Sequence, residues 1–471
     1  MTYDYEDLYA AKKTYGQDIN TSLGNAADPI DADQKLQEDA LMSYVASVNY
    51  SYGDKYYASF SFRRDGSSRL SPDTRWGNFW SLSASWRLSQ EKFMQSLKSV
   101  LSDLKLRASY GVNGNLPSSY YGYQSTYTTG AFYNGKPSPW ESTLGNEELT
   151  WEKNYALNLG LDIGLFSRVN VSLDWYTRTT KDLLMSKQLN SISGFSSLLT
   201  NVGQMRNTGV ELEVRSNNIK TKDFSWTTAF NLSHNKNKIL KLADLPWFVD
   251  GRYVRKEGYP FNTIYLREYA GVDPETGSAL YYDNQQDENG NYTKNKVTDP
   301  GQASPIPLKD ITPTISGGFM NTFNYKFIDL SFNLSYSFGG YSYDNASYIL
   351  QDDGYSVISN KSTEQRRRWQ KPGDITDVPR FVYGNKKGGN YNSSRAIHST
   401  DHIRLKSLIL GLNAPKAWLQ KLGIGNARIY FSGTNLLTWA AYGQYDPEMS
   451  GVVGFYSPPL KTYAFGLELK F

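Results

Sequence analysis

The last thirteen residues of the chain, PLKTYAFGLELKF from Pro459 to Phe471, alternate between two kinds of side chain. One face of the segment carries the apolar side chains Tyr463, Phe465, Leu467, Leu469 and Phe471. The other face carries Thr462, Ala464, Gly466, Glu468 and Lys470. A period of two residues is that of a β-strand with one apolar and one polar face. Its length, about ten residues, is what a tilted strand needs to cross a bilayer.

The same alternation returns along the whole sequence and predicts about thirteen strands. Within 155–165, for example, Leu157 and Leu159 flank Asn158. The alternation changes phase after Ser407, which indicates a β-bulge. The predicted fold is all-β, an antiparallel transmembrane β-barrel. The predicted strands cover 43–52, 56–64, 80–88, 104–113, 155–165, 168–178, 208–216, 223–234, 313–325, 328–338, 402–413, 427–438 and 460–471.

The composition agrees with barrel wall. Mean hydropathy is only -0.57, but in a barrel only alternate residues face lipid. The 37 Tyr, 21 Phe and 11 Trp suit aromatic belts at the two membrane interfaces. With no cysteine there is neither a disulfide nor a thiolate metal site, and no cofactor is expected. The net charge of +4 is mild and dispersed, which gives no support to nucleic-acid binding.

Connections between the predicted strands alternate between short turns and long polar loops. In bacterial barrels the short turns are periplasmic and the long loops extracellular. We therefore expect residues 1–40 to be a partial extracellular loop and 41–471 to be barrel wall. Met1 is followed by no secretion signal, and an odd strand count leaves open edges that are costly in lipid. We expect further sequence and further strands, whether the chain is a fragment or one half of a split barrel.

Longer stretches then support a resemblance. They include RRDGSSRLSPDTRWGNFWSLSASWRLSQEKF at 63–93, LKLRASYGVNGN at 104–115, LTWEKNYALNLGLDIGLFSRVNVSLDWYTRTTKDLL at 149–184, NVGQMRNTGVELE at 201–213, AGVDPETGSALYYD at 270–283, ISGGFMNTFNYKFIDLSFNLSYSFGG at 315–340, IYFSGTNLLTW at 429–439 and YDPE at 445–448. In this order they resemble the C-terminal part of the SusC/RagA-like TonB-dependent outer-membrane transporters of Bacteroidota. The resemblance covers essentially all 471 residues.

The resemblance implies a protein of the cell outer membrane in contact with its lipids. Such transporters are barrels of roughly 22 strands with an N-terminal plug. They are driven through a TonB box by the TonB-ExbB-ExbD complex and are covered by a SusD-like surface lipoprotein. They import glycans, peptides or similar oligomers. The signal, the TonB box and the plug are absent from this sequence, so we expect the chain to supply only the C-terminal barrel portion.

The leading hypothesis is barrel wall of a TonB-dependent importer of glycans or other oligomeric nutrients, with an oligosaccharide or a peptide as substrate. The alternative is a passive outer-membrane channel or surface-binding β-protein without energy coupling. A third possibility is a soluble all-β binding protein with a filled interior. No nucleophile and base stand at a recognisable spacing, so the chain is not expected to be an enzyme.

The candidate site residues follow from the two faces of the strands and from the loops. The polar strand faces are expected to line the lumen through Arg87, Lys105, Arg107, Asp162, Asp174, Glu211 and Glu213. Aromatic side chains in loops could stack on the C–H face of a sugar, although belt anchors or loop packing are the alternatives. These candidates are Tyr133, Trp140, Trp247, Tyr355, Trp439, Tyr442 and Tyr456. Phe471 is expected to act as an assembly signal.

Three further motifs have ordinary alternatives. His398 and His402 have metal-ligand spacing only on a helix, whereas the segment leads into a strand. The acidic cluster in 273–288 lacks the ordered spacing of a calcium loop, which favours turns. Asp65–Arg69 and Arg366–Trp369 could contact an anion or a glycan, but we expect a tight loop and a solvated basic run.

Overall fold

The computed structural model of the chain describes residues 2–11, 31–128, 132–242, 246–356, 358–385, 392–415, 418–419 and 423–471. Its main sheet has 14 strands, and the registers of the adjacent pairs within it that are resolved are antiparallel. The strand order is β1 (Thr2–Ala11), β2 (Asp31–Tyr52), β3 (Tyr56–Ser67), β4 (Trp76–Arg87), β5 (Leu101–Asn115), β10 (Glu152–Leu165), β11 (Val169–Lys181), β14 (Gln204–Lys220), β15 (Phe224–Lys241), β23 (Ile315–Tyr325), β24 (Ile328–Phe338), β27 (His402–Asn413), β28 (Asn426–Ala440) and β30 (Thr462–Lys470).

The sequence prediction of the strands is confirmed. Each predicted segment falls within or largely overlaps one of the strands from β2 to β30 of the main sheet. The additional strand β1 pairs with the first half of β2, Thr2 opposite Ala40 and Ala11 opposite Asp31. This hairpin lies in residues 1–40, which remain an extracellular loop by prediction.

Short turns and long loops alternate as expected. The turn between β2 and β3 places Gly53 and Asp54 at φ 57° and 56°. Positive φ at both central residues gives a hairpin turn whose twist matches that of the strands. Equally short turns join β10 to β11, β14 to β15 and β23 to β24. The intervening loops are long and hold the remaining elements.

Aromatic pairs across neighbouring strands help to fix the registers of the sheet. Trp226 on β15 lies opposite Phe323 on β23, with the rings stacked at 5.5 Å. Phe323 in turn contacts Phe332 on β24 at 6.3 Å. Such cross-strand pairs stabilise a sheet by roughly 0.2–1 kcal/mol each. A slip of one residue would move every such ring to the opposite face, which makes the register specific.

The predicted bulge is present at Lys406. The register of β27 shifts between Leu405 and Ser407 against β28, and the pairing with β24 shifts at the same place. A bulge re-aims the side chains around it. Here the residues on its N-terminal side include Arg404, which has a central place in the site described below.

The loops carry small elements of their own. They are α1 (Asn345–Leu350), the 3-10 helices η2 (Leu88–Gln90), η3 (Lys92–Leu97), η4 (Ser191–Ser193), η5 (Pro300–Gln302), η6 (Thr363–Arg367) and η7 (Ser394–Ala396), and the strands β6 (Thr126–Thr128), β7 (Phe132–Tyr133), β8 (Lys136–Pro137), β9 (Trp140–Thr143), β12 (Leu184–Gln188), β13 (Ser197–Asn201), β16 (Trp247–Asp250), β17 (Tyr253–Lys256), β18 (Thr263–Leu266), β19 (Tyr269–Val272), β20 (Ala279–Tyr282), β21 (Lys296–Val297), β22 (Ile306–Asp310), β25 (Tyr341–Asp344), β26 (Ile397–Ser399) and β29 (Gly451–Val453).

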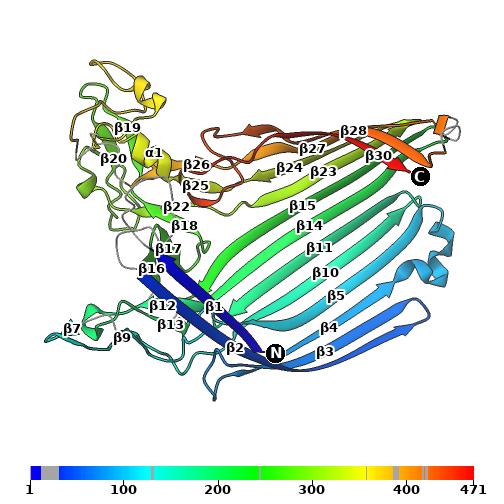
Figure 1. Cartoon of the computed structure of the whole chain (residues 1–471), viewed down its shortest axis with the longest axis horizontal. Coiled ribbons are helices and arrows are strands. Elements are labelled where there is room, and N and C mark those ends of the chain that lie inside the picture. The colour runs from blue at the N-terminus through cyan, green and yellow to red at the C-terminus, as the bar shows by residue number, and fades with distance from the viewer. Residues whose placement is uncertain are drawn as a thin grey trace. The chain divides into compact units, whose positions relative to one another are not determined.

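The chain divides into two compact units. The first comprises 1–84, 109–157 and 178–204, and its core contains Phe79 and Trp151 in edge-to-face contact at 5.2 Å. The second comprises 85–108, 158–177 and 205–471. Within the second unit, β15, β23, β24, β27, β28 and β30 run side by side (Figure 1). Its loop cores form around Ile264 and Tyr343 and around Tyr281.

In the parts of the chain that the structure describes, no helix has both the length and the apolar character needed to cross a membrane.

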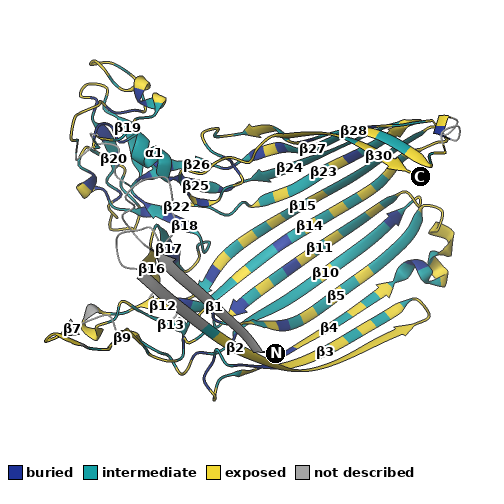
Figure 2. Cartoon of the chain, viewed as in Figure 1, coloured by how far each residue is buried: buried dark blue, intermediate teal, exposed yellow. Residues whose placement is uncertain are grey.

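The apolar face of β30 is open to the surroundings (Figure 2). Phe465 is 82% exposed and Leu467 is 64% exposed, so these large apolar side chains are not packed in a core of the chain. The wet face of the same strand pairs Glu468 opposite Arg428. Both faces of this edge strand are exposed, so the outward direction of the apolar face remains a prediction.

Deleting Phe471 should reduce assembly without impairing transport by the molecules that do assemble. Its side chain is 88% exposed in the structure, so its removal costs about 2–3 kcal/mol of burial at most, even with lipid around it. That is too little to unfold a closed barrel. The measurement is surface abundance of the full-length protein beside uptake per assembled molecule. Normal abundance together with reduced uptake would contradict the role of Phe471 in assembly.

Candidate functional site

A cavity of about 740 Å³ lies in the second unit, where the strand ends meet the loops. One wall is α1 with the residue before it, Asp344, and another is the end of β28 at Thr438. The segment 443–461 closes the remaining side and contributes both polar and apolar groups. The cavity is lined by Asp344, Ser347, Gln351, Tyr445, Tyr456 and Lys461 among others.

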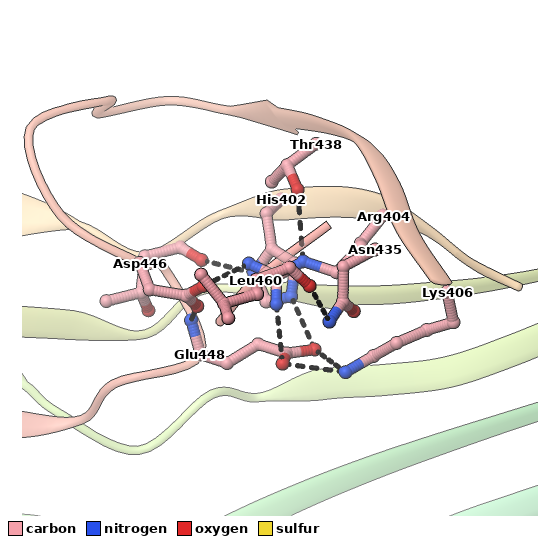
Figure 3. Close-up of polar contacts among 9 residues, drawn as sticks. His402, Arg404, Lys406, Asn435, Thr438, Asp446, Glu448 and Leu460 are labelled. Carbon is pink, nitrogen blue, oxygen red and sulfur yellow. Dashed lines mark hydrogen bonds and ion pairs between the residues drawn. The ribbon is translucent and has the colours of Figure 1, made fainter. Parts of the chain in front are cut away.

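Arg404 lines this cavity. It lies at the centre of a cluster of polar contacts (Figure 3). Its guanidinium donates to Asp446 at 2.7 Å, to Glu448 at 2.8 Å and to the Thr438 hydroxyl at 3.0 Å. Arg404 is only 2% exposed and Asp446 only 8%. A buried charge must be paired, and the planar guanidinium suits three partners at once. The contacts hold the loop at 446–448 against β27.

Two neighbours extend the ion cluster. Lys406, on the bulge of β27, donates to Glu448 at 2.7 Å, and the buried His402 lies 3.8 Å from the same carboxylate. His402 is fixed from its other ring nitrogen by the Thr400 carbonyl at 2.8 Å. Glu448 thus pairs with two cations, Arg404 and Lys406, which fixes the loop more firmly than a single pair would.

A stack of two aromatic rings lies beside α1, where the Tyr442 hydroxyl is 3.2 Å from the Ser347 hydroxyl. His398 lies flat on Tyr442, with ring centroids 3.7 Å apart and planes 3° apart. The Tyr442 hydroxyl donates to Asp344 at 3.1 Å. Asp344 also caps α1, because its other carboxylate oxygen accepts from the Ser347 N–H at 2.8 Å. One carboxylate therefore ties the helix to the loop at 442.

Burial determines how these rings titrate. It raises the pKa of Tyr442 and raises the pKa of Tyr445 to about 12, with the Ser342 hydroxyl opposing it. Both phenols therefore stay neutral hydrogen-bonding groups near pH 7. Burial lowers the pKa of His398 below 6.5, and Asp344 partly offsets the effect.

The stack on α1 should loosen in acid. Because the pKa of His398 is lowered in the folded state, the unfolded loop binds the proton more readily as pH falls from about 6.5. The stabilisation is complete above that pH and is lost as pH falls through the lowered folded value. We expect faster hydrogen exchange in 439–446 at about pH 5 than at about pH 7.5, after correction for intrinsic exchange rates. His398→Phe keeps a ring in the stack and should remove this difference in exchange. An unchanged difference would show that a group other than His398 causes the pH dependence.

The structure distributes the predicted loop aromatics among different places. Tyr456 lines the cavity, whereas Tyr442 does not line it and stacks on His398. Trp439 lies between Thr438 and Ala440 on β28, so its 55% exposed side chain points to the face opposite the cavity. Tyr355 is 51% exposed and lines neither this cavity nor a second one described below.

The remaining aromatic candidates lie further along the loops. Trp247, on β16, lines the second cavity. Tyr133 and Trp140 are in β7 and β9 of the first unit and are 79% and 60% exposed. The prediction that Trp439 lies in a loop is wrong, because β28 of the main sheet extends to Ala440. The other six lie in loops as predicted, but the sequence could not tell which of them share a cavity.

Three of the predicted lumen-lining residues meet in one cluster. Arg107 on β5 donates to Asp162 on β10 at 2.8 Å and to Asp174 on β11 at 2.9 Å. Gly160 makes this possible, because a Cβ there would lie 2.5 Å from both Arg107 and Asp174. The alternating pattern predicts these residues on one face of the sheet. Because Gly160 has no side chain, Arg107 on β5 can reach across β10 to Asp174 on β11.

The other predicted wet-face residues form smaller contacts. Arg87 donates to Asp103 at 2.9 Å. Lys105 lies near Asp162, and Glu213 pairs with Arg215. Glu211 is exposed on the same face of β14 as Glu213. Several of the predicted wet-face charges therefore have a partner of opposite charge, whereas Glu211 is simply exposed.

The motifs with ordinary alternatives serve local structure. Asp65 is buried and pairs with Arg63, whereas Arg69 pairs with Asp39 at 2.8 Å. Arg367 pairs with Asp377 at 2.7 Å. These contacts favour a tight loop and a basic run held by its own carboxylates.

The histidines and the acidic cluster also have local partners. His398 stacks on Tyr442 and His402 bonds to a backbone carbonyl. Asp273 accepts from the Glu275 N–H at 2.9 Å, as in a turn. Among the described residues, no group of three potential ligands is placed to hold a metal ion.

Sequence analysis missed Arg404 and its partners. YDPE at 445–448 was noted only as part of a series of motifs. Arg404 was not distinguished from other polar residues of its strand. The available signal was an arginine beside a phase change in a strand, since a bulge often marks a functional position.

Comparisons with known proteins agree with this architecture. Residues 1–264 match a family model described as TonB dependent receptor-like, beta-barrel. The chain is 33% identical to TonB-dependent receptor P3 of Formosa agariphila over 93% of this chain and 46% of that protein. It is 30% identical to TonB-dependent receptor SusC of Bacteroides thetaiotaomicron over 93% of this chain and 45% of that protein.

A solved structure titled "Structure of the RagAB peptide transporter" matches with a TM-score of 0.88 at 30% identity, covering 100% of this chain and 52% of that one. The fold and these relatives define a β-barrel protein of the outer membrane. The chain belongs to the TonB-dependent receptor β-barrel family and is of the SusC/RagA type. It spans about half the length of the relatives that it matches.

Proposed function

We propose that this chain forms barrel wall and extracellular loops of a TonB-dependent importer of oligomeric nutrients. The observation that carries the proposal is the cavity of about 740 Å³ built over the ion cluster of Arg404, at the loop end of strands β27 and β28. It combines aromatic and apolar groups with hydrogen-bonding side chains, as pockets for organic ligands generally do. Tyr456 and Tyr445 would contact the nutrient there.

The polar strand faces would line the path of the nutrient through the barrel. Arg107 and Lys105 together balance the charges of Asp162 and Asp174, which gives a mixed surface with little net charge. Such a surface binds water and polar solutes without holding them by a strong net charge. Arg87, Glu211 and Glu213 would extend it.

A surface lipoprotein of the SusD type is the proposed partner. The segment 381–383 is Phe-Val-Tyr, and Tyr383 is 80% exposed. The backbone of this segment is held in place, because the Val382 N–H donates to the Asp353 carbonyl at 3.0 Å. Exposed apolar groups on a fixed backbone are typical of protein interfaces. The relative in the structure titled RagAB supports a paired arrangement.

The partner can be tested by co-purification. Tyr383→Ser should reduce recovery of a lipoprotein with the tagged full-length protein. Tyr133→Ser is the matched control, because Tyr133 is 79% exposed in a loop of the other unit. Equal recovery from both variants would remove 381–383 from the interface.

Energy coupling is tested in the native host. Deleting the genes for TonB or ExbB should reduce uptake of a labelled oligomeric nutrient by about tenfold or more, since the plug would no longer be displaced. The readout is uptake per molecule of the protein at the surface. Undiminished uptake in the deletion strain would overturn the importer and support the passive channel without energy coupling.

A further inference from the structure

A second cavity, of about 460 Å³, lies on a small loop sheet of the second unit. The sheet has the strand order β16, β17, β18 and β22. Trp247 pairs opposite Lys256, and Tyr265 pairs opposite Pro307. Side chains of one sheet face therefore converge on the cavity. The residues 284–286, Tyr292, Ser304 and Pro305 complete the lining.

The cavity has an aromatic wall. The rings of Trp247 and Tyr265 lie 5.9 Å apart and are inclined at 49°. Trp247 is 45% exposed, so one side of its indole is available to a ligand. Tyr292 also lines the cavity, close enough to Tyr265 to raise the pKa of that phenol along with burial. The phenol of Tyr265 is thus a neutral group near pH 7.

The polar groups of the cavity are neutral apart from one amine. Asn284 is buried and held by Lys294 at 2.9 Å, and the Gln285 amide donates to Ser304 at 3.2 Å. The side chain of the exposed Gln286 and the hydroxyls of Tyr265 and Tyr292 have no hydrogen-bond partner among the residues that the structure describes. These groups can each donate and accept. Among the described residues that line the cavity there is no carboxylate, and Lys256 is the one cation.

We infer that this second cavity binds a pyranose unit of an oligosaccharide. A pyranose has an apolar C–H face that matches an indole, and hydroxyls around its edge that match amides and phenols. A peptide would bring charged ends or side chains, for which the lining offers a single amine and no carboxylate. The inference rests on the proposed importer and deepens it, because it assigns the substrate class and a first capture site in the loops.

The test uses the full-length protein purified in detergent and an array of neutral and uronate-containing oligosaccharides together with short peptides. We expect binding to oligosaccharides and a loss of about tenfold or more in Trp247→Ala, as for a truncated central aromatic. Trp247→Phe should retain most of the binding. Trp140→Ala is the matched control, because Trp140 is a 60% exposed loop tryptophan outside the cavity.

A second variant guards against misfolding. Gln286→Ala removes an exposed amide that packs against little, and we expect it to weaken the same oligosaccharides severalfold. Binding confined to peptides, or equal binding by Trp247→Ala and Trp140→Ala, would overturn the inference and leave TonB-dependent import intact. Oligosaccharide binding at Trp247 together with uptake that is independent of TonB would support the sugar site and overturn TonB-dependent import.

Discussion

Gly317→Ala should strongly reduce the yield of assembled barrel. A Cβ on Gly317 would lie 2.1 Å from the Asn231 carbonyl oxygen and 2.4 Å from the Tyr336 hydroxyl oxygen. Tyr336 reaches across this glycine from β24 and donates to the Asn231 carbonyl on β15 at 2.7 Å. The first clash is with the backbone of a paired strand, which a rotamer change cannot relieve. Overpacking of this kind costs about 1–3 kcal/mol or more, and the lost hydrogen bond adds about 1 kcal/mol.

The neighbouring glycine supplies the control. A Cβ on Gly318 would lie 3.4 Å from its nearest neighbour, the Asn231 side chain, which is an ordinary contact. Heat-modifiable migration on gels and surface labelling of the full-length protein measure the outcome. We expect folded barrel in Gly318→Ala and little in Gly317→Ala. Equal amounts of folded barrel from the two variants would show that the sheet yields at Gly317.

Arg404→Ala should release the loop that covers the candidate site while leaving the strands in place. The variant leaves Asp446, 8% exposed, without its cation, and breaking a buried pair typically costs about 3–5 kcal/mol. Glu448 is more exposed and keeps Lys406 at 2.6 Å, so its share is smaller. Because the ion cluster joins the loop at 446–448 to β27, the cost falls on the loop.

Limited proteolysis and hydrogen exchange of 443–461 detect this release. We expect rapid cleavage or exchange there, together with a loss of nutrient binding at the cavity. Arg215→Ala is the control, because Arg215 pairs with Glu213 while remaining 72% exposed, and such pairs contribute little. Arg404→Lys keeps a charge without the three-way geometry and should be intermediate. Undisturbed protection of 443–461 in Arg404→Ala would show that other contacts hold the loop.

The sequence by itself determined the strands, their faces and the places of the loops. A period of two is a local property. Over about ten residues, it fixes which side chains lie on the apolar face of the strand and which lie on the polar face. For the same reason the bulge near Ser407 was visible as a change of phase, and Arg107, Asp162 and Asp174 were found on one face. The long and short connections followed directly from the strand boundaries.

Only the tertiary structure decided which of these groups meet. Arg404 and Asp446 are 42 residues apart, and His398 and Tyr442 meet through the path of two separate loops. Tyr336 passes over Gly317 to Asn231 because three strands lie in one specific register. No local pattern encodes a register between strands or the route of a long loop, since both result from packing summed over the whole unit. For this reason the sequence could name the aromatic residues of the loops, and the structure had to separate those that line a cavity from those that do not.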